Sequence, residues 1–145
     1  MNLKPVSLVA TAVLTVAVIS LLLRHSLFGH GPMSIAFQVL AAGLMLWART
    51  TFGGRSFHAG AQPTAGGLVT SGPYRFVRHP IYAAILLFVW AGVASHGTIV
   101  SVLTGIVATA ALAVRMGAEE ALVTGRYPEY VDYARRTKRI IPLVL

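Results

Sequence analysis

The sequence predicts an all-α integral membrane protein with four transmembrane helices. Three observations carry this prediction. The chain is 56% hydrophobic and only 11% charged, whereas soluble domains carry about 25% charged residues. Its apolar runs are long enough to cross a bilayer, and its positive charges gather between those runs. At 145 residues, we expect one domain, residues 1–145.

The first two spans are expected at about residues 6–23 and 32–48. The first run, Val6 to Leu23, could also be read as a signal peptide with Lys4 before it. It is long for a signal peptide and no clear cleavage site follows, which favours a retained helix. In the second span, Pro32 suits a first helical position and Trp47 suits the membrane interface.

The third and fourth spans are expected at about residues 80–94 and 98–115. Ile81 to Val114 contains no charged residue, but one helix of that length would reach about 51 Å, too long for a bilayer core of about 30 Å. Ser95-His96-Gly97 interrupts it, which predicts a helical hairpin. We expect the fourth helix to continue past Arg115, because no helix breaker appears before Thr124-Gly125.

The basic residues predict the orientation of these spans. If the N-terminus is cytoplasmic, every Lys and Arg except Arg24 falls in a cytoplasmic segment or at its boundary. Because cytoplasmic loops are enriched in Lys and Arg, we expect a multi-pass protein of the cell membrane with both termini in the cytoplasm. Three spans would lose this asymmetry.

Two cytoplasmic segments are expected to fold against the helix bundle. The loop at about residues 48–79 is too long for an ordinary connection, and it contains apolar side chains among its Gly and Pro turn signals. The tail has Tyr127, Tyr130, Val131 and Ala134 at helical spacing. This pattern predicts an amphipathic helix that Pro128 can start and Pro142 can end.

Composition also excludes several classes of site. The chain has no cysteine, which rules out disulfides and thiolate chemistry. No two histidines have metal-ligand spacing on one helix, so no metal is expected. Cations set between apolar runs fit membrane orientation and lipid headgroups better than nucleic acid.

All four acidic residues fall in the tail region, as Glu119, Glu120, Glu129 and Asp132. Carboxylates at the C-terminal end of a helix interact unfavourably with its dipole, so we expect a positively charged partner nearby. Arg115 precedes Glu119 by one helical turn, so the two share a face. An arginine at the lipid boundary suits either a functional site or a snorkelling anchor, and the residues alone leave this open.

The Arg78-His79-Pro80 turn is expected to open the third helix. Pro80 fits a first helical turn, and His79 would lie at the exposed helix N-terminus, which favours anions. A lone histidine there also reads as an ordinary interfacial residue. The glycine pairs before this turn, Gly66-Gly67 and Gly72-Pro73, form neither a P-loop nor a Rossmann fingerprint.

The stretch from Gly67 to Tyr82 resembles the isoprenylcysteine carboxyl methyltransferase family. The similarity continues after the hairpin with Arg115, Glu119-Glu120, Leu122, the tail tyrosines and Ile141-Pro142. It covers roughly residues 47–142. Such a resemblance implies a membrane-embedded methyltransferase that uses S-adenosyl-L-methionine and acts on a lipid-soluble or amphiphilic acceptor.

The resemblance also implies a site. A cytoplasmic cofactor pocket would come from residues 49–82 and 115–142, with Arg115 binding the acceptor as the candidate catalytic residue. The cofactor-binding residues would be Gly66, Gly67, Leu68, Val69, Tyr74, His79, Pro80, Ile81, Tyr82, Glu119 and Glu120. The acceptor group could be a carboxylate, as in isoprenylcysteine, a thiol or a phospholipid amine.

Two other functions compete with this one. Membrane sterol reductases resemble the same tail and use NADPH, but the Glu119-Glu120 pair suits a 2′-phosphate poorly. A non-enzymatic membrane scaffold is the third possibility.

Overall fold

The computed structural model describes residues 3–53 and 67–141, and this part of the chain is all-helical, as predicted. In order, its elements are α1 (Leu3–Leu23), α2 (Pro32–Phe52), the 3-10 helix η2 (Gly72–Arg75), α3 (Pro80–His96), α4 (Ile99–Arg126) and α5 (Tyr130–Arg136). Within the described residues, the one β-type contact is an isolated parallel bridge between Val77 and Lys138.

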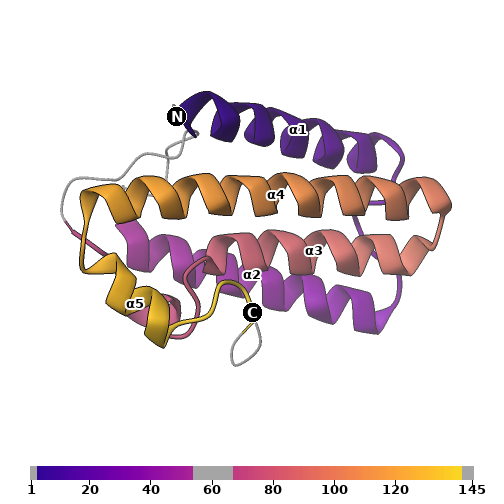
Figure 1. Cartoon of the computed structure of the whole chain (residues 1–145). Coiled ribbons are helices and arrows are strands. Elements are labelled where there is room, and N and C mark those ends of the chain that lie inside the picture. The colour runs from indigo at the N-terminus through magenta and orange to yellow at the C-terminus, as the bar shows by residue number, and fades with distance from the viewer. Residues whose placement is uncertain (1–2, 54–66, 142–145) are drawn as a thin grey trace.

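The four long helices run alternately up and down (Figure 1). Helix α1 packs against α4, α2 packs against α3, and an α3–α4 contact joins the two pairs. The chain's N-terminus, the end of α2, the start of α3, the end of α4 and α5 all lie at one end of the bundle (Figure 1). Segments far apart in the sequence therefore meet there.

Apolar side chains cover much of the outside of the bundle. Leu23 is 74% exposed and Ile99 is 78% exposed, which is costly in water and favourable in hydrocarbon. Helices α1, α2 and α4 are each long and apolar enough to cross a membrane, and α3 is a shorter apolar helix of 17 residues. The chain is a membrane protein.

Helices α2 and α3 end beyond the predicted spans. Helix α2 continues beyond residue 48 to Phe52, and α3 continues beyond residue 94 to His96. Gly97 then ends α3 in the left-handed conformation, with φ 64°. Helix α4 continues past Arg115 to Arg126, which confirms the expected extension. Its 28 residues reach about 42 Å, so its last turns project beyond a core of about 30 Å.

Buried polar contacts fix α2 against α3 at the far end of the bundle. The Gln38 amide donates to the carbonyls of Leu27 (2.8 Å) and Phe88 (3.2 Å), and its oxygen accepts from the backbone of Gly29 (3.1 Å). Gly92 lets α3 approach the same loop, because a Cβ there would lie 2.0 Å from the Leu27 carbonyl oxygen. These contacts hold the register of the helices that carry the site.

The tail forms a helix, α5, that buries two tyrosines. Tyr130 and Tyr133 are buried in α5, whereas Val131 is 41% exposed. The predicted face of Tyr130, Val131 and Ala134 is therefore not packed as a whole against the bundle. The helix is also shorter than expected, since it spans seven residues and the chain turns at Thr137 to join the bridge at Lys138.

Candidate functional site

The turn before α3 is bonded to the tail through backbone atoms. The backbone N–H of Arg78 donates to the Lys138 carbonyl (2.7 Å), and that of His79 donates to the Arg139 carbonyl (2.9 Å). Pro80, which lacks an N–H, occupies the first turn of α3 and is fully buried. The tail thus pairs with the donors next to the helix start, and the two segments become one unit.

Glu120 of α4 is bound by side chains from two other segments, the turn before α3 and the tail. Its carboxylate accepts from Arg78 Nε (3.0 Å), from a ring nitrogen of His79 (3.1 Å) and from Arg139 Nη2 (2.9 Å). The side chains of Arg78 and Glu120 are 11% and 14% exposed. Arg78 also donates to the carbonyls of Ala134 and Thr137. Glu120 therefore joins α4 to the start of α3 and to the tail.

The hydrogen bonds to Glu120 also act on Arg139. They raise the pKa of the Arg139 guanidinium above its usual value, and the negative charge of Glu120 adds to this effect. Arg139 stays about half exposed, with 56% of its side chain accessible. It is the outermost of the cations that hold this carboxylate.

Glu119 belongs to a second group with Tyr82 and Arg115. Arg115 Nε donates to the Tyr82 hydroxyl (2.5 Å) and to the Glu119 carboxylate (3.1 Å). The Tyr82 hydroxyl in turn donates to Glu119. The Tyr82 ring stacks on that of His79, with centroids 5.4 Å apart and planes 7° apart. The sequence prediction that Arg115 and Glu119 share a helix face is confirmed.

Arg115 is buried, with 8% exposure, and does not snorkel to the surface. Its Nη1 donates to the hydroxyl of Thr11, which lies on α1. A buried guanidinium is costly unless its donors are paired. Contacts from α1, α3 and α4 meet this requirement together.

His79 is placed differently from the expectation of a free anion binder. Its ring is 9% exposed and sits between the two carboxylates, with Nε2 3.1 Å from Glu120 and Nδ1 3.9 Å from Glu119. Its ring nitrogens therefore face acids of this chain. The histidine links the Glu120 cluster to the Glu119 group.

The loop before the turn contributes Tyr74 as a packed residue. Tyr74 lies in η2, is buried, and packs its ring against Phe52 with centroids 5.4 Å apart. Its carbonyl accepts from the Tyr133 hydroxyl (2.7 Å). Burial raises the pKa of Tyr133 to about 12, so this hydroxyl stays a neutral donor at physiological pH.

The other predicted cofactor residues are placed less centrally. Gly67, Leu68 and Val69 are half-buried and precede η2, and Ile81 is half-buried in the first turn of α3. Gly66 lies outside the described residues. The contacts that assemble the carboxylate groups come instead from the turn, α4 and the tail.

Sequence reasoning missed two residues of this site. Arg139 was one basic tail residue among several, and only the fold brings it to Glu120. Thr11 is a polar residue inside an apolar run, one turn after Ser7 and one turn before Thr15. That spacing is a signal, but it does not say which helix the hydroxyl meets.

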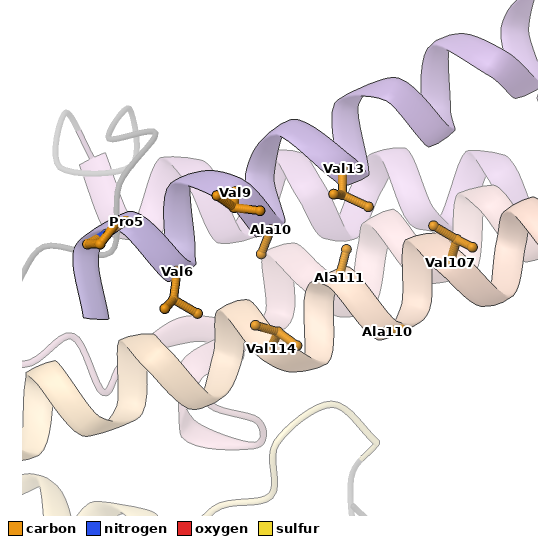
Figure 2. Close-up of a pocket in the computed structure, with 9 residues that line it drawn as sticks. All are labelled: Pro5, Val6, Val9, Ala10, Val13, Val107, Ala110, Ala111 and Val114. Atoms are coloured by element: carbon orange, nitrogen blue, oxygen red, sulfur yellow. The ribbon is translucent and has the colours of Figure 1, made fainter. Parts of the chain in front are cut away.

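An apolar groove runs between α1 and α4. Its volume is about 540 Å³, and Val6, Val9 and Val13 of α1 form one wall. Figure 2 shows Val6 and Val13 reaching toward α4 and Val114 reaching toward α1. Two lining residues, Ala10 and Val114, immediately precede Thr11 and Arg115 in the sequence.

Metal-binding side chains do not cluster in this part of the protein. Among residues 3–53 and 67–141, no group of three or more His, Cys, Asp or Glu side chains is arranged to hold a metal ion. The carboxylates of the site are instead bound by cations of the chain itself.

Two known proteins are similar to this chain over most of its length. The chain is 29% identical to the cobalt-zinc-cadmium resistance protein CzcN of Cupriavidus metallidurans over 86% of its length. It is 32% identical to the nickel-cobalt-cadmium resistance protein NccN of Alcaligenes xylosoxydans xylosoxydans over 90% of its length. The chain spans only about 60% of the length of these two relatives. No solved structure matches it significantly.

The family model for phospholipid methyltransferases matches residues 28–130. That range includes α2, α3, α4 and the whole Arg78–Tyr82 turn, but not α1. The match covers well over half of the chain and contains both carboxylates of the site. The chain therefore belongs to the phospholipid methyltransferase family, a family of membrane methyltransferases.

Proposed function

We propose that this protein transfers a methyl group from S-adenosyl-L-methionine to an anionic acceptor that reaches the site from the bilayer. The observation that carries this proposal is the Arg115–Tyr82–Glu119 group at the end of a membrane helix bundle. Family membership supports methyl transfer. When bound, S-adenosyl-L-methionine supplies the electrophilic methyl group on its sulfonium.

The cofactor site proposed here comprises the start of α3, the end of α4 and the loop before η2. Glu119 suits the cofactor's amino group or ribose hydroxyls, since it is 23% exposed and more accessible than Glu120 at 14%. Glu120 and His79, whose side chains are less exposed, would form the buried side of the pocket. The remaining members proposed from the family resemblance are Gly66, Gly67, Leu68, Val69, Tyr74, Pro80, Ile81 and Tyr82.

Charge balance favours an anionic acceptor. Three guanidinium groups, from Arg78, Arg115 and Arg139, face two carboxylates, from Glu119 and Glu120. The cofactor adds a net positive charge, from a sulfonium, an ammonium and one carboxylate. A carboxylate or thiolate acceptor would reduce this excess, and Arg115 could hold it by charge-assisted hydrogen bonds.

A phospholipid amine fits less well. Such an amine is protonated near neutral pH and must lose a proton before it can attack a methyl group. Both carboxylates that could take the proton are already paired with guanidinium groups of the chain. A carboxylate acceptor needs no general base.

The groove between α1 and α4 supports entry from lipid. Its lining is made of valine, alanine and proline side chains, and it lies next to the helix turns that carry Thr11 and Arg115. A hydrocarbon chain can pass from lipid into such a groove without exposing apolar surface to water. The proposed partners are therefore membrane lipid and an amphiphilic small molecule.

The proposed topology has four spans with both termini in the cytoplasm, which would make α3 a span as well. The end of the bundle that carries α5 also holds the ends of α2 and α4 (Figure 1), whose last turns contain Arg49 and Arg126, and the positive-inside rule places such an end in the cytoplasm. Single cysteines can report on this, because the chain has none. Cysteines at positions 75 and 135 should resist an impermeant thiol reagent in intact cells, and labelling of either would refute the orientation.

Two alternatives carry less support. A reductase would need cations for the phosphates of NADPH, yet the most exposed acid of the site, Glu119, lies in the middle of it. The relatives' names refer to metal resistance, which does not specify an acceptor. A scaffold without a ligand leaves the buried charge network unexplained.

The cofactor is tested by calorimetry on the detergent-solubilised protein. S-adenosylhomocysteine is expected to bind, NADPH is not, and Glu119→Gln should weaken binding by about tenfold or more, as loss of a charged hydrogen bond does. Asp132→Asn, at an exposed ion pair, serves as the control. Binding of NADPH alone would support the reductase, and no change in Glu119→Gln would support the scaffold.

A further inference from the structure

Helix α1 lies outside the family match, which begins at residue 28. It nevertheless packs against α4 (Figure 1) and supplies one wall of the apolar groove. A helix that only closed the bundle would not need a polar contact with the site. The side chain of Thr11 in α1 makes such a contact.

The Thr11 hydroxyl is oriented by its own helix. It donates to the Ser7 carbonyl (2.8 Å), one turn earlier, and Ser7 is fully buried. The donor proton is therefore engaged, and the oxygen lone pairs remain to accept from Arg115. This arrangement makes Thr11 an acceptor held in a fixed direction.

Arg115 uses different edges of its guanidinium for different partners. Its Nε faces the Tyr82 hydroxyl and Glu119, and its Nη1 faces Thr11. Tyr82 and Glu119 alone would fix one edge of the planar group. The contact from α1 fixes a second edge, so the rotation of the plane is determined.

We infer that Thr11 is a positioning residue that orients Arg115 toward the acceptor, so that α1 contributes to acceptor selection as well as to the bundle. This inference rests on the proposed function and identifies a residue outside the family match that serves the same site.

The test compares three variants with the wild type. Thr11→Val removes the hydroxyl and keeps the shape, and Thr11→Ser restores the hydroxyl. Thr15→Val is the matched control, because Thr15 lies one turn further along α1, is exposed, and donates to the Thr11 carbonyl. Methyl transfer from labelled S-adenosyl-L-methionine to an N-acetylated prenylcysteine, a lipid carboxylate, is measured in detergent.

Thr11→Val should lower kcat/KM for the prenylcysteine by about ten- to a hundredfold, as expected for a lost hydrogen bond to a charged group. Affinity for S-adenosylhomocysteine should stay within about twofold, since the cofactor contacts are intact. Thr11→Ser should recover most of the activity, and Thr15→Val should match the wild type. An unchanged kcat/KM in Thr11→Val overturns the inference, as does a parallel loss of cofactor affinity and thermal stability.

A second readout separates this inference from the proposed function. The readout is the NMR spectrum of protein labelled with ¹⁵N-arginine. The Arg115 Nε–H signal is assigned as the signal that is absent from the spectrum of Arg115→Lys. Thr11→Val should shift this signal without any ligand present, and Thr15→Val should not. If the wild type fails to bind S-adenosylhomocysteine, the proposed function fails. If the Arg115 Nε–H signal has the same position in Thr11→Val as in the wild type, the positioning role is overturned, whatever the result of the cofactor-binding experiment.

Discussion

Replacing Arg115 by alanine is expected to abolish methyl transfer while the affinity for S-adenosylhomocysteine stays within about threefold of the wild type, because an acceptor-side group acts on turnover. Arg115 is buried and is the member of the Glu119 group that can hold an anion. Turnover is followed by label transfer and affinity by calorimetry.

Two controls sharpen the Arg115 result. Arg115→Lys keeps the charge but loses the planar pair of donors, so it should recover only a small part of the activity. Arg135→Ala removes an exposed arginine, with 76% of its side chain accessible, and should leave turnover unchanged. If cofactor affinity collapsed together with turnover in Arg115→Ala, Arg115 would belong to the cofactor pocket instead.

Glu120→Gln is expected to lower the free energy of unfolding by about 3 kcal/mol, the lower range for removing one partner of a buried ion pair. The change leaves Arg78, whose side chain is 11% exposed, without its opposite charge, and it alters the group that contacts the His79 ring. It also releases the tail at Arg139. Denaturant titration in mixed micelles, followed by helical circular dichroism, measures the loss.

The matched control for Glu120 is Asp132→Asn. Asp132 forms an ion pair with Arg135 at 3.4 Å, but both side chains are more than 70% exposed. Exposed pairs contribute about 0–1 kcal/mol, so this variant should unfold close to the wild type. Equal effects of the two substitutions would mean that the Glu120 cluster does not hold the tail to the bundle.

Periodicity and charge were enough to predict the helices of the bundle and their alternation. The apolar runs between charged residues became α1 to α4, and the break at Ser95-His96-Gly97 became the end of α3. Helix ends were predicted less well. Helix α2 continues beyond its apolar run to Phe52, because backbone hydrogen bonding does not stop where hydrophobicity does.

From the residues alone, the contacts of the two carboxylates could be predicted only within α4. The spacing of Arg115 and Glu119 follows from helical geometry, so that pair could be predicted. The contact of Arg115 with Thr11 joins residues 104 positions apart, and that of Arg139 with Glu120 depends on how the tail returns to the turn. One sequence does not contain such tertiary pairings, since many helix pairs would bury its apolar faces equally well.

The register of α5 could not be settled from its pattern. Both Val131 and Tyr133 are candidates for a buried face next to Tyr130, and seven residues are too few for periodicity to decide. Tyr133 is buried because its hydroxyl reaches the Tyr74 carbonyl. That contact depends on the position of η2, which tertiary packing determines.

The central claim is that the acceptor is an anion held by Arg115, and it is tested most directly by offering two lipid acceptors to the wild-type protein. Purified protein in vesicles receives labelled S-adenosyl-L-methionine with either N-acetylated prenylcysteine or phosphatidylethanolamine. Label is predicted to enter the prenylcysteine as a base-labile methyl ester and to leave the amine unlabelled. Labelling of phosphatidylethanolamine, with none in the carboxylate, would contradict the account.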